Sequence, residues 1–263
     1  NARGVRDFCQ TLNNKEVIPT PGAIFMASEL LAKGLFEKAG IGSLMLIDIG
    51  GATTDIHSAI PELEELKLEE RGLVINNEKQ FSYRTVEGNL GMRVSAGGVL
   101  EAVGAKTLVS LLDPALGISE AMVIDYIEKV EELTSHVPQN EEENNIDQAI
   151  AIAAIHLAIR RHAGMYARED DAVMGVMAGT AIGRDLRHIK NIVCACGVFV
   201  HASAAKREMI IRKAFENPGN ALLPLDDPRV VFDDHYLMFS LGVLSKWFPD
   251  EVLDFMPKYW EAN

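Results

Sequence analysis

The sequence predicts an α/β fold, because short apolar runs typical of strands alternate with longer helical patterns. Two apolar runs flank a Gly-Gly turn, Leu44 to Ile49 before it and Thr54 to Ile60 after it. A third β-like run, Asn191 to Cys196, meets Gly197 and gives way to a helical pattern. The length of 263 residues is enough to bury a sizeable core in one large or two modest domains.

The other elements of the first half follow from local pattern. Pro19 to Gly40 predicts a turn and an amphipathic helix with Gly40 as its C-cap. The charged segment Glu62 to Arg71 indicates a solvated helix or loop, and a strand is expected around Phe81 to Thr85. Glu87 to Gly91 is a turn-rich loop, and a helical pattern runs from about Met92 through Leu108.

The second half is mostly helical. A helix is expected over Ser119 to Leu133, and the acidic stretch Glu141 to Asn145 indicates a solvated surface loop. The Ala/Ile-rich segment Ile146 to Tyr166 predicts a buried helix, and Val198 to Phe215 predicts another. A linker rich in Pro, Gly and Asn then precedes a last helical region, Tyr236 to Tyr259.

Composition excludes several classes of protein. The formal net charge is −13, which argues against a nucleic-acid backbone or an anionic membrane as the partner, because both need basic surface. No apolar run approaches the roughly 20 residues of a membrane span, and no signal segment opens the chain. The three cysteines are too few and too clustered for a disulfide framework. We therefore expect reduced thiols and a cytoplasmic location.

The stretch LMLIDIGGATTDIHSA, residues 44–59, carries the clearest chemistry. The adjacent Gly50 and Gly51 permit a close approach of a ligand to the main chain. Successive turn N–H groups form a concavity that binds anions, and the hydroxyls of Thr53 and Thr54 add donors. This combination predicts a phosphate-binding turn. The alternative is a plain type I′ or II′ hairpin in which the glycines serve only the turn.

Two carboxylates flank the same turn. Asp48, at the end of the first strand, would repel a phosphate unless a cation lay between them. It is therefore a natural position for Mg²⁺ or a metal-bound water. Asp55, on the returning strand, could do the same or orient a water.

The pattern Asp-x-Gly-Gly-x-Thr-x-Asp between two strands resembles a phosphate loop of the actin-like ATPases, which include sugar kinases, heat-shock chaperone ATPases and hydantoinase-type proteins. This resemblance implies a ribonuclease-H-like fold in two lobes, with ATP and Mg²⁺ in the cleft. By position, Asp48 and Asp55 would serve catalysis and the metal with its waters. The β- and γ-phosphates would be cradled by Gly50, Gly51, Thr53 and Thr54.

Longer segments are similar to the GlmL family, the accessory, reactivating proteins of adenosylcobalamin-dependent mutases such as glutamate mutase. The most specific is TVEGNLGMRVSAGGVLEAVGA, residues 85–105. PTPGAIFMASELLA, GRDLRHIKNIVCACGVFVHAS and SLGVLSKWFPDEVLDFM fit the same family. The resemblance implies that Glu87 and Gly88, on a Gly-bracketed loop with Asn89 and Arg93, face the nucleotide.

In the actin-like superfamily a strand-Gly-helix unit near the C-terminus binds adenosine, and Gly197 is its counterpart here. The superfamily pattern commonly has a Thr-Gly-Gly-like sequence, whereas this chain has Cys194-Ala195-Cys196 before Gly197. A cysteine in place of a glycine would crowd the adenine or the ribose. This departure bears on the affinity for nucleotide.

The resemblance also sets the expected domain organisation. Residues 1–263 would form one actin-like lobe, with a helical insertion at about residues 106–170. The first methionine is Met26, and no second Asp-x-Gly loop precedes Asp48. We therefore expect the C-terminal half of a longer protein, with weak or no ATPase activity by itself.

The function implied is an ATPase that works on a cobalamin-dependent mutase subunit and releases damaged cofactor so that intact cofactor can enter. A homo-oligomer is compatible with this role. Two alternatives stay open. One is a hydantoinase-like, ATP-dependent hydrolase subunit, which shares the Gly-Gly loop. The other is a non-hydrolysing interaction module that binds a mutase subunit.

Overall fold

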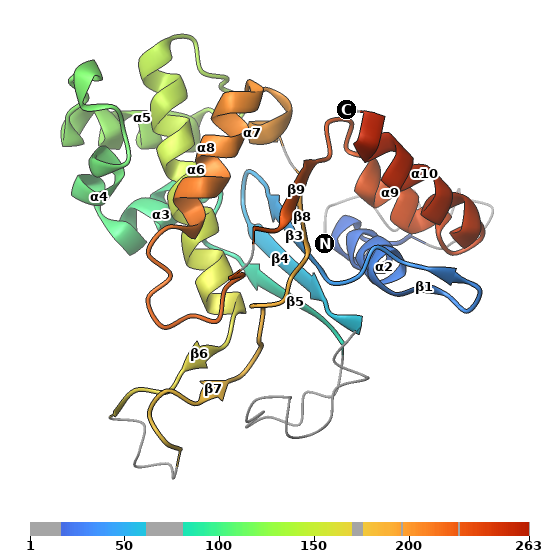
Figure 1. Cartoon of the computed structure of the whole chain (residues 1–263). Coiled ribbons are helices and arrows are strands. Elements are labelled where there is room, and N and C mark those ends of the chain that lie inside the picture. The colour runs from blue at the N-terminus through green and yellow to red at the C-terminus, as the bar shows by residue number, and fades with distance from the viewer. Residues whose placement is uncertain (1–16, 62–80, 170–175, 196, 226, 263) are drawn as a thin grey trace.

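A five-stranded mixed sheet forms the centre of the protein (Figure 1). The computed structural model describes residues 17–61, 81–169, 176–195, 197–225 and 227–262. The sheet has the order β5-β4-β3-β8-β9. Its strands are β3 (Leu44–Ile49), β4 (Thr54–Ala59), β5 (Ser82–Glu87), β8 (Asn191–Ala195) and β9 (Arg229–Phe232). The predicted α/β class is confirmed, and so are the predicted strands β3, β4, β5 and β8.

The directions of the strands determine which strand ends lie at the same edge of the sheet. β3, β4 and β5 form an antiparallel meander, whereas β8 is parallel to β3 and β9 is parallel to β8. The carboxyl ends of β3, β8 and β9 therefore lie on one edge of the sheet, the usual place for a ligand in an open α/β sheet. Asp48 and Asp55 are direct partners in the β3–β4 register.

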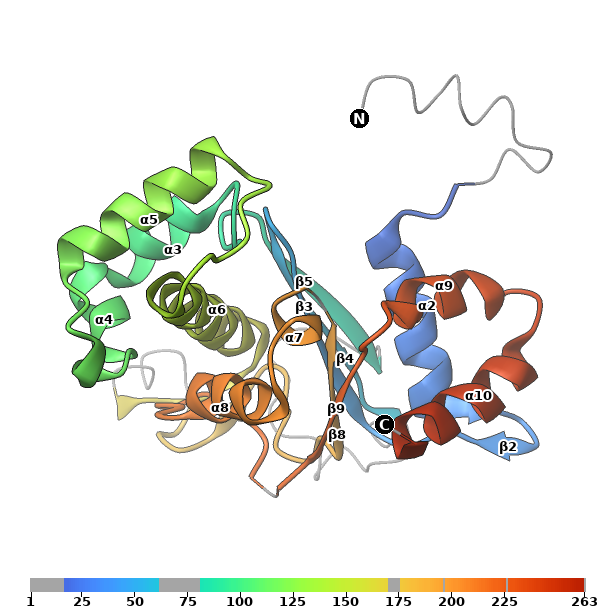
Figure 2. The same cartoon turned by 90° about the horizontal axis from the view of Figure 1, so that it is seen from above.

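Helices cover both faces of the sheet (Figure 2). On one face, α6 (Glu141–His162) packs against the strands beside α7 (Gly197–Val200) and α8 (Ala204–Phe215), and three helices lie on the far side of α6. These three are α3 (Ala96–Val103), α4 (Ala105–Ser110) and α5 (Glu120–Glu132), with a 3₁₀ turn at Pro114–Leu116. The other face is covered by α2 (Thr20–Lys33), α9 (Leu237–Leu244) and α10 (Pro249–Ala262).

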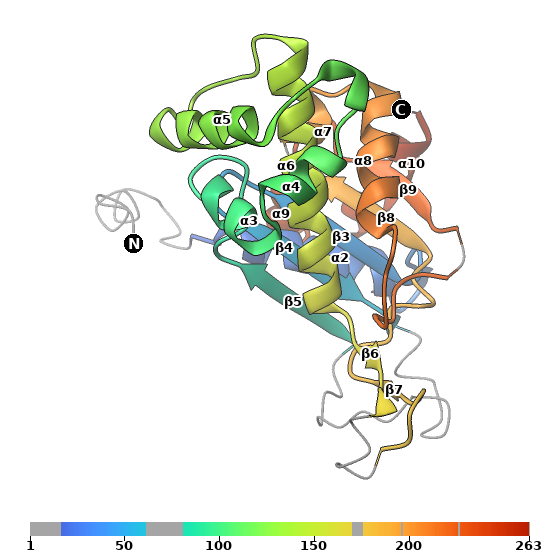
Figure 3. The same ribbon diagram turned by 90° about the vertical axis from the view of Figure 1, so that its left-hand side faces the viewer.

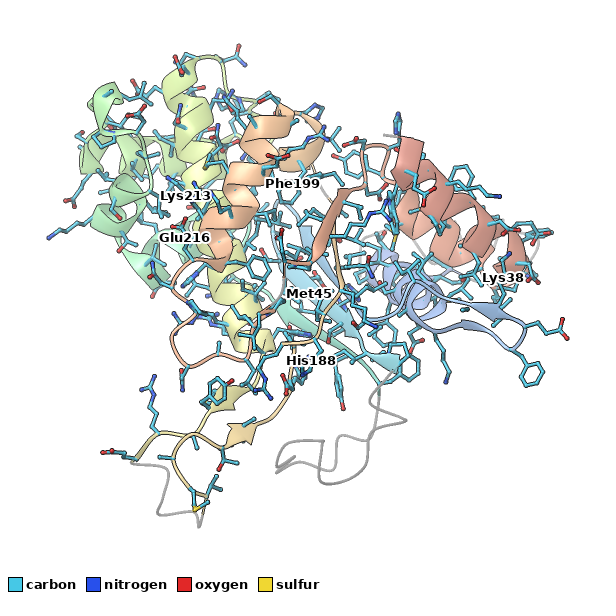
Figure 4. The ribbon with its side chains drawn as sticks, in the orientation of Figure 1. Lys38, Met45, His188, Phe199, Lys213 and Glu216 are labelled. Atoms are coloured by element: carbon cyan, nitrogen blue, oxygen red, sulfur yellow. The ribbon has the colours of Figure 1, made fainter. Side chains whose placement is uncertain are left out.

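The alternation of side chains along β3 builds a core on each face. Met45 and Ile47 belong to the core under α3–α8, and Leu44 and Leu46 belong to the core under α2, α9 and α10. Figure 4 shows Met45 in the middle of the sheet. Because β3 is apolar on both faces up to Ile47, the carboxylate of Asp48 stands out at its end.

The acidic stretch before the Ala/Ile-rich helix is not the predicted surface loop. It is the first turn of α6, where Asn140 caps the helix by accepting from the N–H of Glu143 at 2.8 Å. Glu141, Glu142 and Glu143 lie at the positive end of the helix dipole, and Arg160, Arg161 and His162 lie at the negative end. The charges that suggested a loop instead complement the dipole.

Two predicted boundaries in the first half are wrong. The first helix ends at Lys33 rather than near Gly40, because Gly34 has φ 75° and caps it through a bond from its N–H to Leu30 O. The next residues form the hairpin of β1 (Gly34–Leu35) and β2 (Lys38–Ala39). The helix expected from Met92 begins at Ala96, because Met92 and the following residue bind the Gly-Gly turn. Residues 62–71 lie outside the described part.

Two predictions in the second half also change. The helix expected over Val198 to Phe215 is broken at Ser203, whose extended backbone (ψ 157°) separates α7 from α8. The linker rich in Pro, Gly and Asn is followed by β9, a strand that was not predicted because only four residues, Arg229 to Phe232, form it.

A small two-stranded ribbon projects beyond the C-terminal end of α6 (Figure 3). It pairs β6 (Met165–Tyr166) with β7 (Ala181–Ile182). At the other side of the molecule, Lys38 holds the β1–β2 hairpin against α10 through Asp254 at 2.6 Å. Among the described residues, no helix is both long and apolar enough to cross a membrane.

Candidate functional site

The Gly-Gly turn joins β3 to β4 at the carboxyl edge of the sheet. The Gly50 N–H donates to Thr53 O at 2.8 Å, so Gly51 and Ala52 form a two-residue loop. Type I′ and II′ turns both need a positive φ at the first loop residue. Neither glycine, nor Ala52, has a positive φ. The alternative of a plain type I′ or II′ hairpin is therefore wrong.

The fold itself does not explain glycine at these two positions. A Cβ built on Gly50 or Gly51 would meet its nearest neighbour at 3.5 Å, an ordinary contact distance. On Gly91, by contrast, a Cβ would lie 2.6 Å from the backbone of the turn. Gly51 and Ala52 are exposed residues, and their N–H groups bind no acceptor within the described part of the chain. The turn thus presents open backbone donors, which suit an anion.

A cavity of about 540 Å³ lies against this turn. Its walls come from the end of β3, the loop before α3, the start of α6 and the segment around α7. Of the residues predicted for the site, the cavity brings together Asp48, Gly50, Gly51 and Gly197. Two segments about 150 residues apart in sequence therefore line the same cavity.

Asp48 is the carboxylate of β3 that lines this cavity. Burial, together with the charges of Asp55 and Asp233, raises the pKa of Asp48 to about 6, against the opposing charge of Arg84. A cation beside Asp48 would favour its ionised form. The position suits a metal ion or a metal-bound water better than it suits a bare phosphate.

Asp55, the cross-strand partner of Asp48, has a different environment. Its Oδ1 accepts from Nε and Nη2 of Arg84 at 2.9 and 2.5 Å, and its Oδ2 accepts from the Thr53 hydroxyl at 3.1 Å. Its side chain is 4% exposed and is not part of the cavity wall. The described residues contain no group of three or more His, Cys, Asp or Glu side chains placed to hold a metal. The metal role of Asp55 stays a prediction.

The other predicted residues lie beside the turn rather than on the cavity wall. Thr54 is buried, and its hydroxyl donates to Leu90 O at 2.8 Å. Glu87 forms an ion pair with Arg161 on α6. Gly88 is exposed, with open space where a Cβ would be. Contact of Thr54, Glu87 and Gly88 with a ligand stays a prediction.

The wall opposite the turn is built on Gly197 and α7. Phe199 anchors α7, because it is buried and its ring lies 5.5 Å from that of Phe232 on β9 (Figure 4). A Cβ on Gly197 would lie 3.1 Å from the hydroxyl of Tyr236, so this glycine makes room for the tyrosine. Tyr236 lines the cavity with a left-handed backbone (φ 54°), a conformation that non-glycine residues adopt mainly at constrained sites.

Of the two cysteines before Gly197, Cys194 is fully buried in the core under α3–α8 and does not line the cavity. Cys196, which directly precedes Gly197, lies outside the described residues, so the crowding of a nucleotide by a cysteine stays a prediction. Beyond β9, Asp233 accepts from the N–H groups of Leu237 and Met238 at 2.8 and 2.9 Å. Asp233 thus binds N–H groups of the first turn of α9.

Sequence reasoning missed the wall contributed by α6. Asn144, Asp147 and Gln148 line the cavity. Asn144 falls in the stretch that was interpreted as a loop, whereas Asp147 and Gln148 fall in the segment that was predicted as a buried helix, with no face assigned. Their i, i+3 and i+4 spacing is the signal that would have placed them on one side of a helix. Arg93, which was considered for the nucleotide, also lines the cavity and binds Asp147.

Comparison with known proteins identifies a family for the chain. A family model described as MutL protein matches residues 1–260. The chain belongs to the MutL family. A curated relative, Protein MutL of Clostridium tetanomorphum, is 35% identical to it over 259 residues. The family resemblance that the sequence carries is thereby confirmed. The aligned region covers 98% of this chain and 54% of the relative, so the chain spans about half the length of the curated MutL protein that it matches.

Proposed function

We propose that this chain is the ATP-binding lobe of an accessory ATPase that serves an adenosylcobalamin-dependent mutase of the glutamate mutase type. In this proposal the complete protein uses ATP binding and hydrolysis to release damaged cobalamin from the mutase. Family membership supports the accessory role. The mutase subunit and ATP belong to the proposal.

The observation that carries the nucleotide site is the pair of glycines on the cavity wall. Neither Gly50 nor Gly51 is needed for φ or for space within the fold. Both border a cavity whose volume lies in the range of small-molecule sites. A ligand that approaches the backbone closely accounts for glycine at both positions.

The distribution of charge supports one orientation of the nucleotide. Phosphates would lie at the open N–H groups of the turn, with Mg²⁺ between them and Asp48. Glu141, Glu142 and Glu143 at the start of α6 would repel phosphates from the other end. There the amide side chains of Asn144 and Gln148 line the cavity, and amides suit the edge of a purine base.

The residues present fit Mg-ATP. When bound, the metal would neutralise phosphate charge, and the turn N–H groups would donate to the phosphate oxygens as charge moves onto them. Asp55 would keep Thr53 and Arg84 in place, and it would reach the metal only after leaving Arg84. The proposal also includes a ribonuclease-H-like fold. The antiparallel meander followed by two parallel strands, with helices on both faces, supports it.

Isothermal titration of Mg-ATP and Mg-ADP into this chain tests the proposal, with Asp48→Asn as the site variant. Saturable binding that Asp48→Asn weakens is expected. The same titration on the longest natural chain then precedes an assay of mutase reactivation. Absence of binding in both chains would contradict the ATPase and favour the interaction module.

A further inference from the structure

The loop that precedes α3 binds the backbone of the Gly-Gly turn. The N–H of Met92 donates to Gly50 O at 3.0 Å, and the N–H of Arg93 donates to Gly51 O at 2.8 Å. Gly91 packs so closely on the turn that a Cβ there would lie 2.6 Å from Gly51 O. Any movement of this loop would therefore move the turn.

The side chain of Arg93 fixes that loop in turn. Its Nε donates to His136 O at 3.1 Å, and its Nη1 donates to Met92 O at 2.6 Å. Nη1 and Nη2 also donate to the two carboxylate oxygens of Asp147 at 3.0 and 2.8 Å. The side chains of Arg93 and Asp147 are 17% and 9% exposed. This forked geometry is specific to a guanidinium group, and a lysine could not reproduce it.

The helical layer holds the other end of the pair. The Tyr126 hydroxyl on α5 donates to Asp147 Oδ1 on α6 at 3.0 Å. Burial and the nearby charge of Asp147 raise the pKa of Tyr126, so the hydroxyl keeps its proton and remains a donor. His136 is itself held by Glu143, with Nε2 and Oε2 2.9 Å apart.

We infer that Arg93 is a positioning residue: through Asp147 it ties the Gly50–Gly51 turn to helices α5 and α6 and holds the turn N–H groups in place for phosphate. This inference rests on the proposed nucleotide site. The pair has a second effect at the same place. Asp147 lines the cavity, and the guanidinium balances a carboxylate that would otherwise repel phosphate.

A second trio of the same composition supplies a matched control. Arg187 binds Asp185 through Nε and Nη2 at 2.8 and 2.5 Å, and its Nη1 donates to the Tyr166 hydroxyl at 2.9 Å. The Arg187 and Asp185 side chains are 24% and 19% exposed. Neither residue lines the cavity or touches the turn. Arg187→Lys therefore removes a similar fork without disturbing the site.

The test compares Arg93→Lys, Tyr126→Phe and Arg187→Lys in the full chain. Hydrogen exchange of the ligand-free proteins reports three bonded backbone amides, those of Gly50, Met92 and the residue at position 93. In Arg93→Lys these amides should exchange about tenfold faster, the factor expected for the loss of about one charge-assisted hydrogen bond. Amides of β8 should be unchanged, Tyr126→Phe should give a smaller effect, and Arg187→Lys should give none at the turn.

Titration of Mg-ATP into the same proteins gives the second readout. Arg93→Lys should weaken binding by about tenfold or more, and Arg187→Lys should bind as the parent does. Unchanged exchange at the three amides in Arg93→Lys would overturn the positioning inference, whether or not ATP binds. Absence of ATP binding by both the parent and the longest natural chain would contradict the proposed function instead, and the exchange data would still decide the positioning.

Discussion

Asp48 and Asp55 face each other across β3 and β4, yet within the described part of the chain only Asp55 is paired with a cationic side chain. Asp55 is bound by the guanidinium of Arg84 and by the hydroxyl of Thr53. Asp48 lines the cavity, and its pKa is raised to about 6. Two identical side chains in register therefore have different environments, and only that of Asp48 is part of the cavity wall.

The raised pKa of Asp48 predicts a pH dependence that Asp48→Asn removes. The pKa of Asp48 in the folded protein, about 6, exceeds its reference value of 3.8. The folded state therefore binds more protons than the unfolded state between these values, and this residue's contribution lowers the free energy of unfolding as pH rises from 4 to 6. Relative to wild type, Asp48→Asn should gain up to about 3 kcal/mol between pH 4 and pH 7.

Urea unfolding of both proteins at several pH values measures this difference directly, because other titrating groups are common to the two. Parallel pH profiles would contradict the assignment. In the same range, Mg-ATP binding should strengthen as pH rises through 6, since the metal needs the ionised carboxylate.

The Arg84–Asp55 pair predicts a loss of stability rather than of ligand binding alone. Arg84→Met leaves Asp55, whose side chain is 4% exposed, without its cation. Breaking a fully buried pair costs about 3–5 kcal/mol. Arg84 is 34% exposed, so we expect a smaller loss, about 2 kcal/mol. Chemical denaturation measures it. Arg212→Met, which breaks an exposed pair with Glu216, should cost less than about 0.5 kcal/mol, and equal losses in the two variants would contradict the prediction.

The part of the site on β3 and β4 was predictable because it is local in sequence. Apolar runs locate the strands, and the residues between them, Asp48 to Asp55, must lie at the strand ends. The position of Gly197 on the cavity wall was predictable for the same reason, since it lies two residues after the end of β8. The ribonuclease-H-like fold was implied by resemblance and not by these patterns.

The α6 wall was not predictable in the same way. Glu141 to Asn145 has the composition of a loop, whereas in the structure it is the first turn of α6, capped by Asn140. The contact of Arg93 with Asp147 joins residues 54 positions apart, and no local pattern encodes it. The ion pair of Asp55 with Arg84, 29 positions later, was not predictable for the same reason.

Gly51, in the turn, and Gly91, in the loop packed against it, predict opposite effects of an added methyl group on stability. Gly51 has room for a Cβ and no positive φ, so Gly51→Ala should keep or raise stability by up to about 1 kcal/mol, because it restricts the unfolded chain. The same methyl would point where a phosphate approaches the backbone, and Mg-ATP affinity should fall about tenfold or more, roughly 1.4 kcal/mol or above.

Gly91→Ala should lower the stability instead. Its Cβ would lie 2.6 Å from the backbone of the turn, so the loop must shift, with a cost of about 1–3 kcal/mol in stability. Thermal unfolding and titration of both variants give the comparison. A Gly51→Ala variant that binds Mg-ATP as tightly as the parent would remove the main support for a phosphate at this turn.

The amides at the start of α6 predict selectivity for the base. Gln148 is 5% exposed and lines the cavity together with Asn144, its neighbour one helical turn away. In the proposed orientation the base lies between this wall and the turn. Gln148→Leu should then lower the affinity for Mg-ATP several-fold and reduce the difference in affinity between Mg-ATP and Mg-GTP. The reason is that one specific amide–base contact contributes about 1–3 kcal/mol of discrimination. Binding of Mg-tripolyphosphate, which has no base, should be unchanged.

Asn145→Ala is the control, because Asn145 is on the same helix but does not line the cavity. Competition titrations with the three ligands measure these affinities. Equal weakening of tripolyphosphate and ATP by Gln148→Leu would show that Gln148 acts on the phosphate end, and the proposed orientation of the nucleotide would have to be reversed.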